Sequence, residues 1–235
     1  MTKPLEESIA ARLYELCLRS EKLGGPVFTK FLSPPEAAQA QHIARERRTG
    51  VTLSGGYQGA ERVIACFHLP GETLDFPIDC LRIAWDVRYG RADHRALLGS
   101  VLALGIERSL VGDIVLQEEA AFLLAAREMA PFIADNLQSS GRVTVKATVL
   151  DEIPPLSPKE GNLFRVTVAS LRLDAVLSAG LNLSRSRASA LIVSGQVQVN
   201  HHLELRTDTQ LKEGDLLSIR GFGRLKLNAL GEPTR

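Results

Sequence analysis

The residues of this chain best suited to hold a ligand stand at the start of one short helix. Ser184, a suitable N-cap residue, is followed by Arg185, Ser186 and Arg187, and apolar residues at helical spacing come next. Free backbone N–H groups and the helix dipole make such a terminus attractive to anions. Two arginines in the first turn add positive charge. The chemistry predicted here is the binding of phosphate.

Other elements must position that helix. Upstream, the amphipathic segment Leu171–Leu177 predicts a helix that ends near Gly180. Downstream, Val197–Val199 alternates as a strand, and glycine turns bound two more short strands. Two short helices packed on a small twisted sheet are therefore expected. The side chains expected to form the ligand-binding surface there are Arg172, Ser184, Arg185, Ser186, Arg187, Gln196, Asn200, Arg220 and Arg224.

In the order of its motifs, this segment resembles the RNA-binding domain named after small-subunit ribosomal protein S-four, also called the alpha-L motif. The resemblance covers Leu171 to about Leu227 and rests on RLD, then SRSRA and LI, then GQVQVN, GD and GFGR. Two departures stand out. Ser189 and Ala190 occupy positions that are often basic in that family, and His201 stands where a glycine usually follows the asparagine. The alternative is a solvated basic helix on an ordinary small domain.

Charge and cysteine content limit the function classes. The net charge is +1, but residues 161–235 carry 10 Lys+Arg against 6 Asp+Glu, so the basic excess lies with the motif. The cysteines, Cys17, Cys66 and Cys80, are odd in number and lack metal-ligand spacing. Neither a secretion signal nor an apolar run of ~20 residues is present. We expect a cytoplasmic protein without a membrane span, metal or cofactor.

The N-terminal part, residues 1–74, predicts a mixed α/β domain. Helices are expected over 5–22 and from the Ser33 cap to Arg48, and strands over Val51–Leu53 and Glu61–His68. Between the strands, GGYQGAE loosely suggests a phosphate-cradling loop. Its glycine spacing does not fit the dinucleotide fingerprint, and no Lys-Ser/Thr follows as in a P-loop. A structural turn is favoured.

The middle part, residues 75–150, has the element order β-α-β-β-α-β. Residues 79–88 alternate, with Leu81, Ile83, Trp85 and Val87 predicted to point inward. Helices are expected after Asp93 and over 127–137, where Pro131 must lie in the first turn. The order predicts a ferredoxin-like, RNA-recognition-type domain. No aromatic stands on the outward face of its two clearest strands, so the predicted contacts are to RNA backbone, through Arg91, Arg95 and Arg108.

The expected fold class is thus α+β, with three small domains. A Pro-rich linker over 151–162 separates the middle domain from the alpha-L domain at 163–235. The oligomeric state cannot be read from these patterns.

A second resemblance spans nearly the whole chain. It rests on Gly55-Gly56-Tyr57 with Ala60-Glu61-Arg62, on the run from Asp93 to Gly99, on 104–108 and on Gly112-Asp113-Ile114. These motifs look like the bacterial YlmH family, whose cyanobacterial and plastid branch is labelled photosystem II S-four domain proteins. The resemblance implies that the protein binds ribosomal RNA of the large ribosomal subunit, with peptidyl-tRNA as a further partner. It also implies a role in rescue or quality control of stalled translation.

Catalysis is not expected. Gly90-Arg91-Ala92-Asp93 matches the letters around a pseudouridine synthase nucleophile, but Asp93 precedes a helix and is better placed as its cap. No glycine fingerprint of a methyltransferase is found, and the pair His201-His202 is too isolated to bind metal. An RNA-modifying enzyme anchored by the alpha-L domain remains the main alternative, and a photosystem II assembly-related factor is the third.

Overall fold

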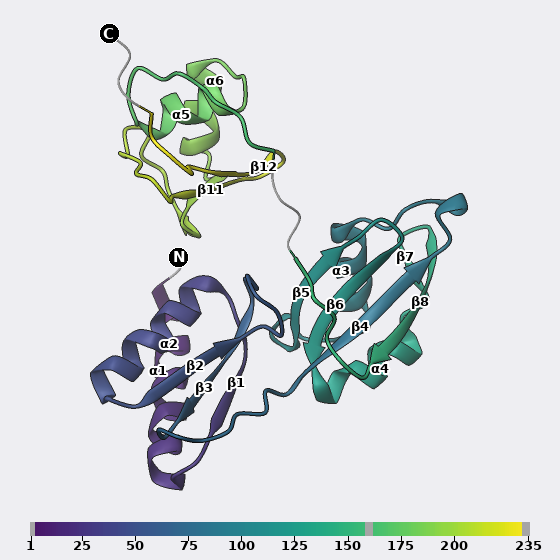
Figure 1. The fold of residues 1–235 in the computed structure, drawn as a ribbon. Coiled ribbons are helices and arrows are strands. Elements are labelled where there is room, and N and C mark those ends of the chain that lie inside the picture. The colour runs from purple at the N-terminus through teal and green to yellow at the C-terminus, as the bar shows by residue number, and fades with distance from the viewer. Residues whose placement is uncertain (1–2, 158–161, 232–235) are drawn as a thin grey trace. The chain divides into compact units, whose positions relative to one another are not determined.

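The computed structural model describes residues 3–157 and 162–231 (Figure 1). The chain divides into two compact units, Met1–Glu160 and Gly161–Arg235. Mixed helices and sheets build both units, which confirms the predicted α+β class.

The N-terminal half of the first unit is a three-stranded antiparallel sheet with two helices on one face (Figure 1). Leu13 and Cys17 of the first helix and Ile43 of the second pack on Phe67 of the central strand. The Ser33 N–H donates to the Glu36 carboxylate at 2.6 Å, so the second helix begins at the predicted cap. The elements are α1 (Lys3–Leu23), β1 (Val27–Leu32), α2 (Pro34–Arg47), β2 (Gly50–Ser54) and β3 (Val63–His68), with strand order β1-β3-β2.

The second half of the first unit has the predicted β-α-β-β-α-β order. Its antiparallel sheet runs β5-β6-β4-β8-β7, which is the ferredoxin-like strand order with a short edge strand added. Both helices pack on one face, where Leu81 meets Leu97, Val101 and Ile133 in a closed core. The elements are β4 (Ile78–Trp85), α3 (His94–Ala103), β5 (Val111–Leu116), β6 (Ala120–Ala126), α4 (Ala130–Asn136), β7 (Ser139–Ser140) and β8 (Val143–Leu150).

Two local predictions in this sheet need correction. The strand predicted over 79–88 ends at Trp85, because Asp86 accepts a hydrogen bond from the Arg88 N–H and caps a 3-10 turn. Val87 is therefore 42% exposed and not inward. The helix predicted from Arg127 starts with a 3-10 turn, and α4 follows with Pro131 in its first turn as expected.

The outward face of this sheet is only partly open. Cys80 and Phe122 on this face share a core with Phe31 and Ile64, which come from the N-terminal sheet. Leu156 of the predicted linker is also buried in this core. The two halves of the first unit are thus joined by apolar packing, and residues 151–157 belong to it; residues 158–161 lie outside the described part of the chain.

The C-terminal unit consists of two short helices packed on a small sheet, as the sequence predicts. Leu177 and Ile192 from the helices bury against Val197 and Leu217 from the sheet. Its elements are α5 (Leu173–Gly180), α6 (Arg185–Val193), β9 (Val197–Val199), β10 (His202–Leu203), β11 (Leu216–Ile219) and β12 (Gly223–Lys226), with strand order β10-β9-β11-β12.

The hairpin between β9 and β10 places His201 in a left-handed backbone conformation. Its two-residue loop is Asn200-His201, with φ of 49° and 69°. Positive φ at both central residues is the type I′ geometry, for which glycine is preferred at the second position. His201 therefore occupies a strained backbone conformation that glycine would adopt without strain.

We expect His201→Gly to raise the free energy of unfolding of the C-terminal unit by about 1 kcal/mol, the relief of strain less the added chain entropy. Urea unfolding followed by circular dichroism measures it. His202→Gly is the matched control, since His202 is paired in β10 and glycine weakens a strand. A lower midpoint for His201→Gly than for the wild type would contradict the assigned turn geometry.

Candidate nucleic-acid interface

The predicted anion-binding terminus of α6 is present. Ser184 is the N-cap residue, and its Oγ accepts a hydrogen bond from the Arg187 N–H at 3.3 Å. The Oγ atoms of Ser184 and Ser186 lie 3.1 Å apart, and both residues are exposed. Two hydroxyls, backbone N–H groups and the positive end of the helix dipole therefore face solvent together.

A buried carboxylate ties this terminus to the start of α5. Asp174 is 5% exposed, and its Oδ2 lies 2.7 Å from Nη2 of Arg185. Nε and Nη2 of Arg172 donate to the same carboxylate at 3.2 and 3.3 Å. Arg172 and Arg185 remain 38% and 51% exposed at their side chains. One carboxylate thus holds two arginines side by side while their remaining N–H groups face water.

Two opposing effects set the protonation of this carboxylate. Burial acts to raise the pKa of Asp174, but the hydrogen bonds and charges of Arg172 and Arg185 outweigh burial and lower that pKa. Asp174 is therefore ionised at neutral pH and keeps both arginines in place. The sequence contained this residue in the RLD motif, yet no role was predicted for it. A charged residue within the apolar segment LDAVL was the available signal.

The other basic residues predicted in this unit do not gather at one point. Arg187 and Arg220 are exposed, and Arg224 is exposed on β12. The Arg220 N–H donates to the Gln196 carbonyl oxygen at 2.9 Å, which places Arg220 beyond the C-terminal end of α6. Since α6 has nine residues, that end lies about 13 Å from the serine-arginine terminus. A single phosphate cannot contact both ends, so an extended backbone would be needed to span them.

Asn200 and Gln196 have largely structural contacts. The Asn200 side chain donates to Asp215 at 2.9 Å and accepts the Leu216 N–H at 3.0 Å. Its amide therefore holds β9 beside β11, while Asn200 itself is exposed, and its RNA contact stays a prediction. The Gln196 amide nitrogen donates to Ser194 Oγ at 2.9 Å, which leaves its carbonyl side as the part that can meet a ligand.

Of the three arginines predicted in the middle domain, two face solvent. Arg91 and Arg95 are exposed on either side of Asp93, whose carboxylate accepts the Ala96 N–H at 2.8 Å. This hydrogen bond makes Asp93 the N-cap of α3, the structural role favoured from the sequence.

Arg108 is a correction to the predicted site. Its guanidinium donates to the carbonyl oxygens of Val111 and Gly112 inside its own unit. Burial, together with repulsion from Arg62, lowers the pKa of Arg108 to about 10. Its side chain is half-buried and holds the chain entering β5, which argues against the predicted RNA contact.

The glycine-rich turn between β2 and β3 is a structural turn held by Asp113. The Asp113 carboxylate accepts hydrogen bonds from the Tyr57 hydroxyl at 3.0 Å and from the N–H groups of Glu61 and Arg62 at 2.7 and 3.2 Å. A Cβ on Gly55 would lie 2.3 Å from the Ala60 Cβ, so the turn closes only with glycine there.

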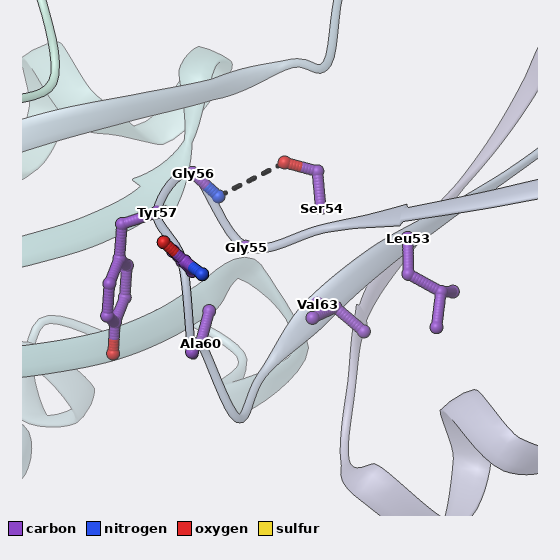
Figure 2. Close-up of a pocket in the computed structure, with 9 residues that line it drawn as sticks. Leu53, Ser54, Gly55, Gly56, Tyr57, Ala60 and Val63 are labelled. Atoms are coloured by element: carbon purple, nitrogen blue, oxygen red, sulfur yellow. Dashed lines mark hydrogen bonds between the residues drawn. The ribbon is translucent and has the colours of Figure 1, made fainter. Parts of the chain in front are cut away.

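Figure 2 shows the pocket of about 460 Å³ that this turn encloses, with the Gly56 N–H donating to Ser54 Oγ. None of the lining side chains is charged, so the pocket offers no cation to a phosphate. The lining residues are Leu53, Ser54, Gly55, Gly56, Tyr57, Gln58, Gly59, Ala60 and Val63.

No group of three or more His, Cys, Asp or Glu side chains within 3–157 and 162–231 could hold a metal ion. Among the helices of those same ranges, none has the length and hydropathy that crossing a bilayer requires.

Two family models match this chain, one in each unit. Residues 71–152 match the family model described as a putative RNA-binding domain in YlmH, and residues 171–217 match the S4 domain. The chain is 33% identical over 214 residues to the ribosome-associated protein quality control protein P2 of Bacillus subtilis (strain 168), covering 88% of this chain and 82% of the relative.

A solved structure supports the fold. The cell division protein ylmH from Streptococcus pneumoniae superposes with a TM-score of 0.55 at 21% identity, over 62% of this chain and 90% of that one. Both matched domain types are RNA-binding modules, and the arginine-bearing surfaces described above lie within or beside them.

Proposed function

Because the chain belongs to the YlmH family of proteins with a C-terminal S4 domain, we propose that it binds ribosomal RNA on the large ribosomal subunit while peptidyl-tRNA is still bound. In this proposal it acts without catalysis, in the quality control of stalled translation. RNA binding itself is supported by both matched domains. The ribosomal setting comes from the Bacillus subtilis relative, which is named as ribosome-associated and as a quality control protein.

The observation that carries the RNA-binding part is the pair of arginines held by Asp174 beside the exposed cap of α6. Guanidinium groups bind phosphate through paired N–H donors, and a fixed orientation lowers the entropy lost on binding. The carboxylate is buried and the arginines remain partly exposed, so the pair is fixed before a ligand arrives. Phosphate would then sit against Arg185, Arg187 and the serine hydroxyls.

The non-enzymatic part is supported by the role of Asp93. A pseudouridine synthase needs its aspartate free to attack the uracil ring, whereas this carboxylate caps α3. The relative and the matched domains are named for RNA binding and ribosome association.

The test is co-sedimentation with purified large ribosomal subunits, either empty or carrying peptidyl-tRNA. We expect the double variant Arg185→Ala/Arg187→Ala to bind roughly 25- to 60-fold more weakly at 0.1 M salt, since each lost phosphate contact flattens the log-affinity against log-salt slope by about 0.7–0.9. The double variant Arg206→Ala/Lys212→Ala is the control, because it removes the same charge from other exposed positions of the same unit.

The wild type should also bind subunits that carry peptidyl-tRNA more tightly than empty subunits. Equal affinity of the wild type for subunits and for naked RNA fragments would contradict the ribosomal proposal and leave a general RNA-binding protein. An unchanged salt slope in the Arg185/Arg187 variant would place the binding face elsewhere.

A further inference from the structure

The chain carries a third exposed arginine that the fold brings to the pair Arg91 and Arg95. Arg142 lies in the turn between β7 and β8, about fifty residues further along the chain. Figure 1 shows β7 beside α3, and these elements are in contact. A residue so distant in sequence could not be assigned to this surface from spacing alone.

Glycines in two of these segments lie beside residues of the others. A Cβ on Gly90 would lie 3.2 Å from Cγ2 of Val143, and a Cβ on Gly141 would lie 3.7 Å from the Ala96 Cβ. Arg91 follows Gly90, Arg95 precedes Ala96, and Arg142 stands between Gly141 and Val143. The three arginines are therefore anchored on one small area where the loop 86–93, the start of α3 and the β7–β8 turn meet.

These arginines are available to a ligand. All three are exposed, and no side-chain ion pair or hydrogen bond links Arg91, Arg95 or Arg142 to another described residue. The acidic residues nearest in the chain are otherwise engaged. Asp86 is paired with Arg88 at 2.6 Å, and Asp93 caps α3. The three arginines therefore outnumber the one remaining carboxylate, Asp93, and the formal charge at this end of the domain is positive.

We propose that Arg91, Arg95 and Arg142 form one binding surface for the sugar-phosphate backbone of RNA, and that this surface, not the sheet face, is where the middle domain contacts RNA. The sheet face is unsuited to base stacking because its aromatic residue, Phe122, is only 8% exposed and lies in the core shared with the N-terminal half. Guanidinium groups bind phosphate through paired N–H donors, so a cluster of them favours the RNA backbone as its ligand.

The inference rests on the proposed function in taking RNA as the ligand, and it adds Arg142 and the exclusion of the sheet face. The test uses the full chain with two labelled probes, a 30-base-pair RNA duplex and an unstructured RNA of the same length. Arg142→Ala should weaken binding about five- to eightfold at 0.1 M salt and flatten the slope of log-affinity against log-salt by about 0.7–0.9. Arg91→Ala and Arg95→Ala should each have an effect of the same size.

Lys146→Ala is the matched control. It removes one exposed charge from β8, but its side chain stands on the sheet face, in register with Ala84. An effect of Lys146→Ala equal to that of Arg142→Ala would overturn the assignment to the end of the domain. A second outcome would also overturn it: Arg142→Ala leaves the salt slope of RNA binding unchanged, while Arg185→Ala/Arg187→Ala still weakens RNA binding. That outcome would leave the proposed function intact. Absence of RNA binding by the wild type would remove both.

Discussion

Asp174→Asn is expected to weaken RNA binding by about fivefold or more at 0.1 M salt, although it makes the protein more positive. Charge alone predicts the opposite, because removing a carboxylate from an RNA-binding unit raises its attraction for phosphate. The expected loss of RNA affinity follows from the position of Asp174 between Arg172 and Arg185. The asparagine amide group would turn N–H groups toward one of the two arginines, and neither Arg172 nor Arg185 would keep the fixed orientation that the carboxylate imposes.

Glu213→Gln supplies the matched comparison. Glu213 is exposed in the turn before β11, and its neutralisation changes the charge of the unit by the same amount without touching either arginine. We expect Glu213→Gln to bind RNA as tightly as the wild type or slightly more tightly. Fluorescence anisotropy with an RNA duplex over a salt series measures both variants. Tighter binding by Asp174→Asn would show that Asp174 has no positioning role.

Asp174→Asn is also expected to change how the stability of the C-terminal unit depends on pH below neutrality. The pKa of Asp174 is lowered in the folded protein, so its ion pairs stabilise the C-terminal unit above the unfolded-state pKa of about 4 and this contribution is lost as the pH falls through the folded value. Between those two values the wild type should lose stability more steeply than Asp174→Asn. Unfolding midpoints between pH 2 and pH 5 would test this, with ~pH 7 as the reference.

Much of the fold could be predicted because local patterns and tertiary packing agree. Some signals depend only on residues a few positions away and so can be read from the sequence. They are the alternation of Leu81 and Ile83, the helix caps Ser33 and Ser184, and Pro131 at the start of a helix. The ferredoxin-like order followed from the sequence of such elements. Val87 was misplaced because a neighbouring side chain, Asp86, ends the strand before the alternation does.

The site was harder to predict because contact partners are distant in the chain. Arg108 matched the expected type of residue, but two backbone carbonyls of the entry to β5 hold it inside. Asp174 and Arg142 were missed for the same reason. Asp174 acquires its role only when Arg185 comes beside it, and Arg142 only when a hairpin turn reaches α3. Residue type alone thus predicts which side chains can bind phosphate, and the fold decides which of them are held in place, buried or brought together.

The largest effect is expected from separating the two units. The α6 terminus of the C-terminal unit and the Arg91, Arg95 and Arg142 surface of the first unit are the two proposed RNA-binding sites on this chain. When two linked sites match two fixed positions on a target, the second binding event becomes intramolecular and affinity rises by about 10²–10⁴-fold. A large ribosomal subunit offers fixed positions, whereas a short free RNA does not.

We therefore expect the full chain to bind large ribosomal subunits at least ~100-fold more tightly than either fragment, 1–160 or 161–235, and more tightly than an equimolar mixture of the two. On the 30-nucleotide RNA the advantage should largely disappear. Each fragment is first checked by circular dichroism, since 75 residues is near the lower limit for a stable core. A mixture of folded fragments that binds subunits as tightly as the intact chain would show that the sites act independently, and that the connection between units adds nothing to ribosome binding.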